Sequence, residues 1–270
     1  MISQAISGVV SFLYMLRRFT VLRMEGDERR VDSAACGRLC GMGVPMGLQC
    51  SITAIGSVIM QSAVNVLGST AVAAVTAAGK TQNLLTVPLE SIGTAMATYA
   101  GQNLGASKLG RIRRGTRSAM LMITVYSVAA AVFLHFFDVI IIGLFIDTAT
   151  ETTIVAMASE YMFWNSLFFI PLGALIVCRY VIQGLGYSTL AMMAGVAEMV
   201  ARTAVAVVLV PMLGYFGAEL SNPAAWVAAC VFLWPAYRWT MRQLQNRMHA
   251  RRLAALHTIG MEPPAETDQD

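Results

Sequence analysis

A line of polar side chains runs through a stretch of the chain that is otherwise apolar. Amide or hydroxyl residues recur at every fourth position, and these are Gln49, Thr53, Ser57, Gln61 and Asn65. Because an α-helix has 3.6 residues per turn, this spacing predicts a slowly winding stripe on one side of a helix. Such groups exchange hydrogen bonds, so the stripe indicates either bonding to other helices or one wall of a water-filled cavity.

Charged side chains also occur inside apolar segments. Lys80 lies about ten residues, roughly 15 Å, from the glycine turn at Gly68, and Asn83 shares its face. An unpaired ammonium ion at that depth costs at least about 2.5 kcal/mol in a bilayer, so it needs a partner or water. Glu198 and Arg202 are four residues apart, and we predict that they neutralise each other as neighbours on one helix.

Another apolar segment carries an aromatic face. Tyr161, Asn165, Phe168 and Leu172 fall on one side of a predicted helix. Helical spacing of aromatic residues is most simply explained by packing. A cavity for flat organic cations would use the same residues, through cation–π and apolar contact.

Signatures of catalysis are missing from the sequence. It contains no HExxH, no GxSxG, no P-loop and no metal-like pair of cysteines, and its three histidines are scattered. We therefore predict neither an enzyme nor a metal site or cofactor. Without a nucleotide-binding signature, any transport would have to be driven by a partner or by an ion gradient, and Na⁺ or H⁺ are the candidate coupling ions. All five cysteines are predicted to be free thiols, and these are Cys36, Cys40, Cys50, Cys178 and Cys230.

The composition indicates that lipid is the solvent. Of the 270 residues, 57% are hydrophobic and 13% are charged, and the mean hydropathy is +0.63. Soluble domains average about 45–50% apolar and about 25% charged residues. Each membrane-spanning helix needs about 20 apolar residues, so we predict an all-α membrane protein with a six-helix transmembrane bundle. The predicted spans are 43–67, 71–99, 118–137, 154–181, 189–213 and 224–240.

The positions of the basic residues test this count. Most of the 19 Lys and Arg residues fall into three clusters, within 17–38, 108–117 and 238–252. Long apolar tracts separate the clusters, so they cannot form one continuous groove for nucleic acid. With six spans, all three clusters lie on one side, which the positive-inside rule assigns to the cytoplasm. We therefore expect a multi-pass protein of the plasma membrane with a cytoplasmic C-terminus.

Four parts follow from this reading. Residues 1–16 resemble the end of a truncated transmembrane helix, and 17–42 form a cytoplasmic basic connector. Residues 43–240 make the six-helix lobe. Residues 241–270 are a cytoplasmic tail, basic at first and then acidic and disordered.

Several stretches resemble the multidrug and toxic compound extrusion (MATE) family of efflux transporters. They are GVPMGLQCSITAIGSVIMQSAVNVLGSTAVAAVTAAGK, MATYAGQNLGASKLGRIRRG, RYVIQGLGYS and LSNPAAW, in the order and spacing of that family. The most distinctive segment is GQNLGA at 101–106. The resemblance covers about residues 1–245 and includes the end of the sixth helix and the C-terminal lobe.

The resemblance implies a two-lobed plan with a central cavity that opens to each side in turn. Some sodium-coupled members carry a Glu and an Asp in the seventh and tenth helices. The matching positions here are Thr53 and a position near Leu172, so that cation site does not carry over. Proton-coupled members use an acid in the first helix, a segment that this sequence does not contain.

The leading hypothesis is the C-terminal half of a cation-coupled exporter of drug-like or cationic compounds, with an N-terminal lobe or a second copy as its partner. A lobe of a lipid-linked saccharide flippase is one alternative, but its cavity should carry several cations, and we identify Lys80 and Arg202 as candidates. A non-transporting membrane interaction protein is another. In each case the lipid bilayer is a partner.

Overall fold

The structure is a computed structural model that describes residues 2–19, 32–146 and 151–258, with side chains up to residue 250. All regular elements in these ranges are helices. Two compact units are present, residues 1–41 and 42–270, and each is described by itself.

The first unit contains helix α1, Ile2–Arg18, and the first residues of α2. None of the α1 side chains is buried. Helix α2 begins at Ser33 because the Asp32 carboxylate accepts a hydrogen bond from the backbone N–H of Ala34 at 2.9 Å, which satisfies a donor at the helix start. The middle of the predicted basic connector, residues 20–31, lies outside the described residues.

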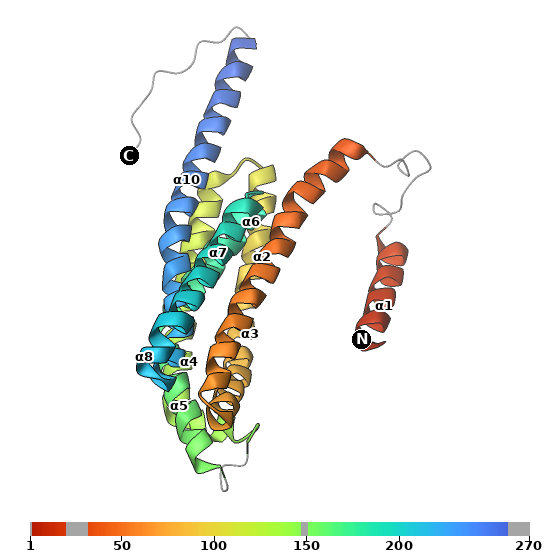
Figure 1. The fold of residues 1–270 in the computed structure, drawn as a ribbon. Helices are drawn as coiled ribbons and strands as arrows, with labels where there is room; N and C mark the ends of the chain where they lie inside the picture. The colour runs from red at the N-terminus through yellow and green to blue at the C-terminus, as the bar shows by residue number, and fades with distance from the viewer. Residues whose placement is uncertain (1, 20–31, 147–150, 259–270) are drawn as a thin grey trace. The chain divides into compact units, whose positions relative to one another are not determined.

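The second unit is a bundle of helices (Figure 1). In chain order the helices are α2 (Ser33–Val66), α3 (Ser69–Gly105), α4 (Leu109–Ile142), α5 (Thr152–Leu167), α6 (Phe169–Gly184), α7 (Ser188–Ala204), a π-helix (Val205–Leu209), α8 (Val210–Leu213), α9 (Tyr215–Glu219) and α10 (Ser221–Thr258). Each predicted span falls on one helix or on a consecutive group of these helices. The all-helical membrane fold is therefore confirmed.

By length and composition, four helical segments of the described chain can cross a membrane: Ser33–Val66, Leu109–Ile142, Ser188–Leu213 and Tyr215–Ala250. The bent pair α5 and α6 provides a fifth. Helix α3 coincides with the remaining predicted span and is 37 residues long, but it does not pass the same test. Its Lys80, Glu90 and many small or polar residues lower its hydropathy, and it packs against α4, α5 and α6.

Two proline residues explain the irregular points of the bundle. The predicted span 154–181 breaks at Phe168 with a bend of 55°, because Pro171 lacks a backbone N–H and its ring displaces the carbonyl four residues earlier. The π-helix Val205–Leu209 widens the helix of the predicted span 189–213 before Pro211, so this irregular turn also comes just before a proline.

Helix α6 is the centre of the bundle and contacts α3, α4, α7 and α10. Its crossing with α3 is close: a Cβ atom added at Gly184 would overlap the backbone carbonyl of Ala97. Larger side chains would force the two helices apart. Lipid gives membrane helices no hydrophobic drive to associate. Small residues at a crossing let the two backbones approach closely, which increases the dispersion contact between the helices.

The helices continue into segments predicted as loops. The basic segment 101–117 is helical except for residues 106–108, and α10 continues to Thr258. The predicted loop 214–223 contains α9 and the start of α10. In the two basic segments, Arg and Lys are good helix formers, so the helices extend beyond their apolar parts.

Candidate functional site

A cavity of about 590 Å³ lies between α2, α3 and α6. Three residues of the predicted polar stripe line it, Gln49, Thr53 and Ser57. The opposite wall contains Glu90 of α3 and Arg179 of α6. Spaces of 300–1,000 Å³ are typical of small-molecule sites. The stripe therefore faces a cavity over these residues, as one of its two sequence interpretations requires.

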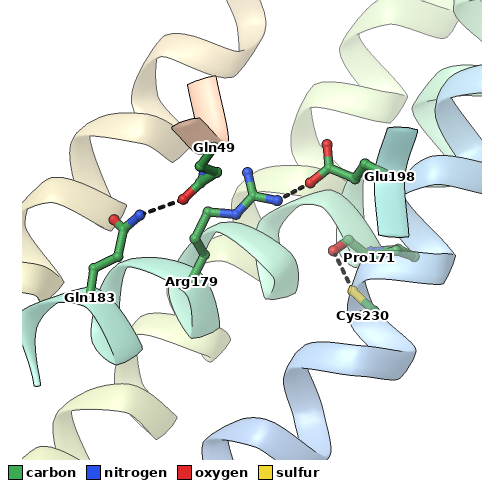
Figure 2. Close-up of polar contacts among 6 residues, drawn as sticks. All are labelled: Gln49, Pro171, Arg179, Gln183, Glu198 and Cys230. Carbon is green, nitrogen blue, oxygen red and sulfur yellow. Dashed lines mark hydrogen bonds and ion pairs between the residues drawn. The ribbon is translucent and has the colours of Figure 1, made fainter. Parts of the chain in front are cut away.

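An ion pair and an amide pair hold the α6 wall in place (Figure 2). Arg179 donates to the Glu198 carboxylate of α7, and both side chains are largely buried. One turn further along α6, the Gln183 amide donates to the Gln49 carbonyl oxygen at 2.7 Å. The Arg179 charge is thus compensated behind the wall, while the amide pair links α2 to α6.

Glu90 is the exposed carboxylate of this cavity. One of its oxygens accepts a hydrogen bond from the Tyr180 hydroxyl at 2.7 Å. Tyr180 itself lines the cavity, which places an aromatic ring beside a carboxylate. Since Arg179 is paired with Glu198, the ionisable groups at this wall leave one negative charge in excess. Such a surface attracts organic cations.

The predicted pairing of Glu198 with Arg202 is wrong. Glu198 binds Arg179, and the Arg202 guanidinium donates instead to the Asn222 Oδ1 of α10 at 2.6 Å. Positions four apart on one helix are neighbours, but each long side chain turns to whichever group an adjacent helix supplies. The i,i+4 spacing therefore gave the burial of Glu198 but not its partner.

A second, partly buried polar network joins α3, α5, α7 and α10. Asn222 donates to the Tyr161 hydroxyl at 3.1 Å and to the Gln82 carbonyl oxygen at 3.3 Å. The Asn165 amide donates to the Tyr161 backbone carbonyl at 2.8 Å. Tyr161, Asn165 and Arg202 thus come together, as candidates from two different predicted spans, but they do not line the 590 Å³ cavity.

The remaining candidates lie apart from both groups. Lys80 is exposed and lies 5.8 Å from the centre of the Phe145 ring, in a cation–π contact. Asn83 is exposed, and Gln61 donates to Asn65 within α2 at 3.2 Å. Phe168 is the residue at which α5 ends and α6 begins, so it does not continue the face formed by Tyr161 and Asn165.

Sequence reasoning missed Arg179, Gln183 and Glu219. Arg179 lies outside the three basic clusters and inside an apolar segment, which is a signal of the same kind as Lys80. Glu219 falls between the predicted spans 189–213 and 224–240. It is fully buried, and its two carboxylate oxygens have no hydrogen-bond partner among the described residues. Its burial depends on α9, a short helix that the sequence does not signal.

Known proteins share both the sequence and the fold. Residues 45–208 match the MatE family. Two probable multidrug resistance proteins of Bacillus subtilis strain 168 are similar. YpnP is 26% identical over 189 residues, which is 68% of this chain and 40% of YpnP. YoeA is 25% identical over 158 residues, which is 57% of this chain and 34% of YoeA. The chain therefore matches well under half the length of these relatives.

Solved structures share this fold. A MATE protein in the bent conformation superimposes with a TM-score of 0.79 at 20% identity, over 90% of this chain and 55% of that one. A mutant of the Vibrio cholerae MATE transporter VcmN gives 0.77 at 17% identity, over 87% and 53%. These identities show the fold alone. With the family match covering more than half of the residues, this chain belongs to the MatE family of transporters.

Proposed function

We propose that this chain is the C-terminal lobe of a secondary transporter that exports drug-like or cationic compounds in exchange for Na⁺ or H⁺. The observation that carries the proposal is the 590 Å³ cavity with its exposed Glu90 and its neutralised Arg179. The two B. subtilis relatives are probable multidrug resistance proteins, which supports efflux as the activity.

The proposed setting is the plasma membrane, with the basic clusters at the cytoplasmic side. Arg113 of α4 donates to Gln245 of α10 at 2.7 Å, so two of the three basic clusters lie at the same end of the second unit. A partner completes the transporter in this proposal. It is an N-terminal lobe or a second copy of this chain, because the chain covers 55% of the solved MATE protein.

The direct test is efflux of a fluorescent cationic dye from cells that lack their own exporters. Cells that express this chain together with a matching N-terminal MATE lobe should keep less dye than cells that express either part alone. Collapse of the sodium gradient and of the proton gradient, one at a time, identifies the coupling ion. Dye retention that no matching lobe lowers would contradict the proposal.

Glu90→Gln tests the proposed role of the cavity. Replacing the carboxylate by an amide removes about 1.4 kcal/mol or more of attraction for a cation, so binding of a cationic dye should weaken about ten-fold. Binding of a neutral dye of similar shape should change little. Glu160→Gln is the matched control, because Glu160 is exposed on α5 and outside the cavity lining. Equal loss in both variants, or for both dyes, would exclude charge recognition by Glu90.

The flippase alternative is less well supported. A pyrophosphate-linked lipid needs a cationic cavity, whereas Lys80 lies over Phe145 and Arg202 binds Asn222, both outside the 590 Å³ cavity. Arg179 does line it, but Glu198 compensates its charge. A non-transporting protein would have no need of such a cavity. In such a protein, Glu90→Gln would change neither dye binding nor dye efflux.

A further inference from the structure

A second large cavity lies at the basic end of the bundle, away from the site described above. It measures about 630 Å³ and lies between the turn that joins α3 to α4 and the C-terminal half of α10. Gly110 and Arg113 of α4 line one wall, and Gln245 and His249 of α10 line the other. The proposed transport function makes no use of it.

The cavity is cationic, and its lining in the described part of the chain contains no carboxylate. Arg113 is held at the wall by its 2.7 Å hydrogen bond to Gln245, a neutral partner that leaves the guanidinium charge uncompensated. Neither 101–117 nor 238–250 contains an Asp or Glu. Besides Arg113, the same two segments carry seven Lys and Arg residues, which are Lys108, Arg111, Arg114, Arg117, Arg238, Arg242 and Arg247.

Residues on the two walls of the cavity lie at the same depth relative to the bilayer. Arg113 lies five residues before the predicted span that begins at Ser118, and Gln245 lies five residues after the one that ends at Thr240. At 1.5 Å per residue, both are about 7–8 Å beyond the apolar segment. Lipid headgroups occupy about 5–8 Å on each side of the hydrocarbon layer, so the cavity lies at headgroup level.

The rest of the lining suits an amphiphile. Leu109 and Met248 line the cavity beside Arg113, so a cationic group and apolar side chains are presented together. A free phosphate ion would use the guanidinium and have no use for the apolar wall. A phosphate diester that carries acyl chains would use both. Basic pockets at this level of membrane proteins bind anionic lipids by such contacts.

We propose that this cavity binds the phosphate headgroup of an anionic membrane phospholipid, with Arg113 as the principal contact. The phosphate accepts hydrogen bonds from the Arg113 guanidinium, while the first part of the acyl chains lies against Leu109 and Met248. A lipid held there joins α4 to α10 at the point where the two helices leave the bilayer.

The test is lipid binding by the delipidated chain, measured by native mass spectrometry after addition of phosphatidylglycerol or phosphatidylcholine. The wild-type chain should bind phosphatidylglycerol several-fold more tightly. Arg113→Gln should weaken this binding about five-fold. Gly110→Leu should weaken it to a similar degree with every charge retained, because a Cβ atom at Gly110 meets open space and a larger side chain can extend into the cavity.

Two controls separate a built site from general attraction to a basic surface. Gly37→Leu also extends into open space, outside the cavity lining, and Arg38→Gln removes a charge from another basic cluster. Both should bind phosphatidylglycerol like the wild type. Wild-type retention by Gly110→Leu, or equal retention of phosphatidylcholine, would overturn the proposal. Displacement of the lipid by an equal concentration of inorganic phosphate would assign the site to free phosphate instead.

Discussion

Arg179 shows how a charged side chain is stabilised inside this membrane bundle. Its guanidinium binds Glu198, and the pair joins α6 to α7 next to the cavity (Figure 2). Near the α5–α6 break, the Cys230 thiol of α10 donates to the Pro171 carbonyl at 3.0 Å. Polar atoms in lipid must find such partners, because water is not available to them.

Removing one member of the Arg179–Glu198 pair should be costly. Glu198→Leu or Arg179→Met alone leaves a buried charge without its partner, and we expect a loss of about 3–5 kcal/mol in the free energy of unfolding. The double substitution should cost much less than the sum of the two. Denaturant unfolding of the purified chain, analysed as a double-mutant cycle, measures the difference. Additive effects would mean that the two side chains do not interact.

Individual residues also mark the limit of what could be predicted. The polar stripe and the burial of Glu198, Tyr161 and Asn165 follow from one rule, that lipid does not solvate polar groups. The partner of Glu198 could not be predicted, because it comes from another helix and depends on how α6 packs on α7. Glu219 was missed for the same reason, since α9 is buried by its neighbours rather than by its own pattern.

At the scale of elements, the sequence predicted the helices more accurately than their ends. Span positions follow from runs of apolar residues, and each predicted span lies on helix in the structure. The break at Phe168 was not predicted, because a proline such as Pro171 can bend a membrane helix by very different amounts. The basic segments extend their helices because charged residues with good helix propensity do not end a helix.

The α3–α6 crossing should respond to one methyl group. Gly184→Ala places a Cβ atom against the Ala97 carbonyl, so the helices must separate, and we expect a loss of about 1–3 kcal/mol in unfolding free energy. Gly79→Ala on α3 is the control, since a Cβ atom there meets nothing within 4 Å. It should be neutral or slightly stabilising. Thermal unfolding in detergent compares the two, and equal midpoints would refute the close approach.

At the scale of the whole molecule, cavities and charges are arranged by depth in the second unit. The cationic cavity lies at the end where α10 projects beyond its neighbours (Figure 1). The 590 Å³ cavity lies within the apolar part of the bundle, where Gln49, Thr53 and Ser57 line it. One unit therefore carries a candidate substrate site and a candidate lipid site that share no lining residue.

Water access to the 590 Å³ cavity can be tested with the native cysteines. Cys50 is exposed and lines the cavity, whereas Cys178 is buried with 3% of its surface exposed. In chains that keep one cysteine each, a membrane-impermeant maleimide should label Cys50 and leave Cys178 unlabelled. A cationic dye should slow the labelling of Cys50. Equal protection of the two thiols would show that water does not enter.

The amide pair between Gln183 and Gln49 is a direct hydrogen bond between the side chains of α2 and α6. Side-chain hydrogen bonds between membrane helices are worth about 0.6 kcal/mol on average and about 1.7 kcal/mol at most. At room temperature these energies correspond to population ratios of about three and about eighteen. These ratios correspond to open fractions of about 25% and about 5% for a contact that nothing else supports. Micromolar binding of one small molecule releases about 8 kcal/mol, which is more than this contact contributes to holding the stripe-bearing wall against α6.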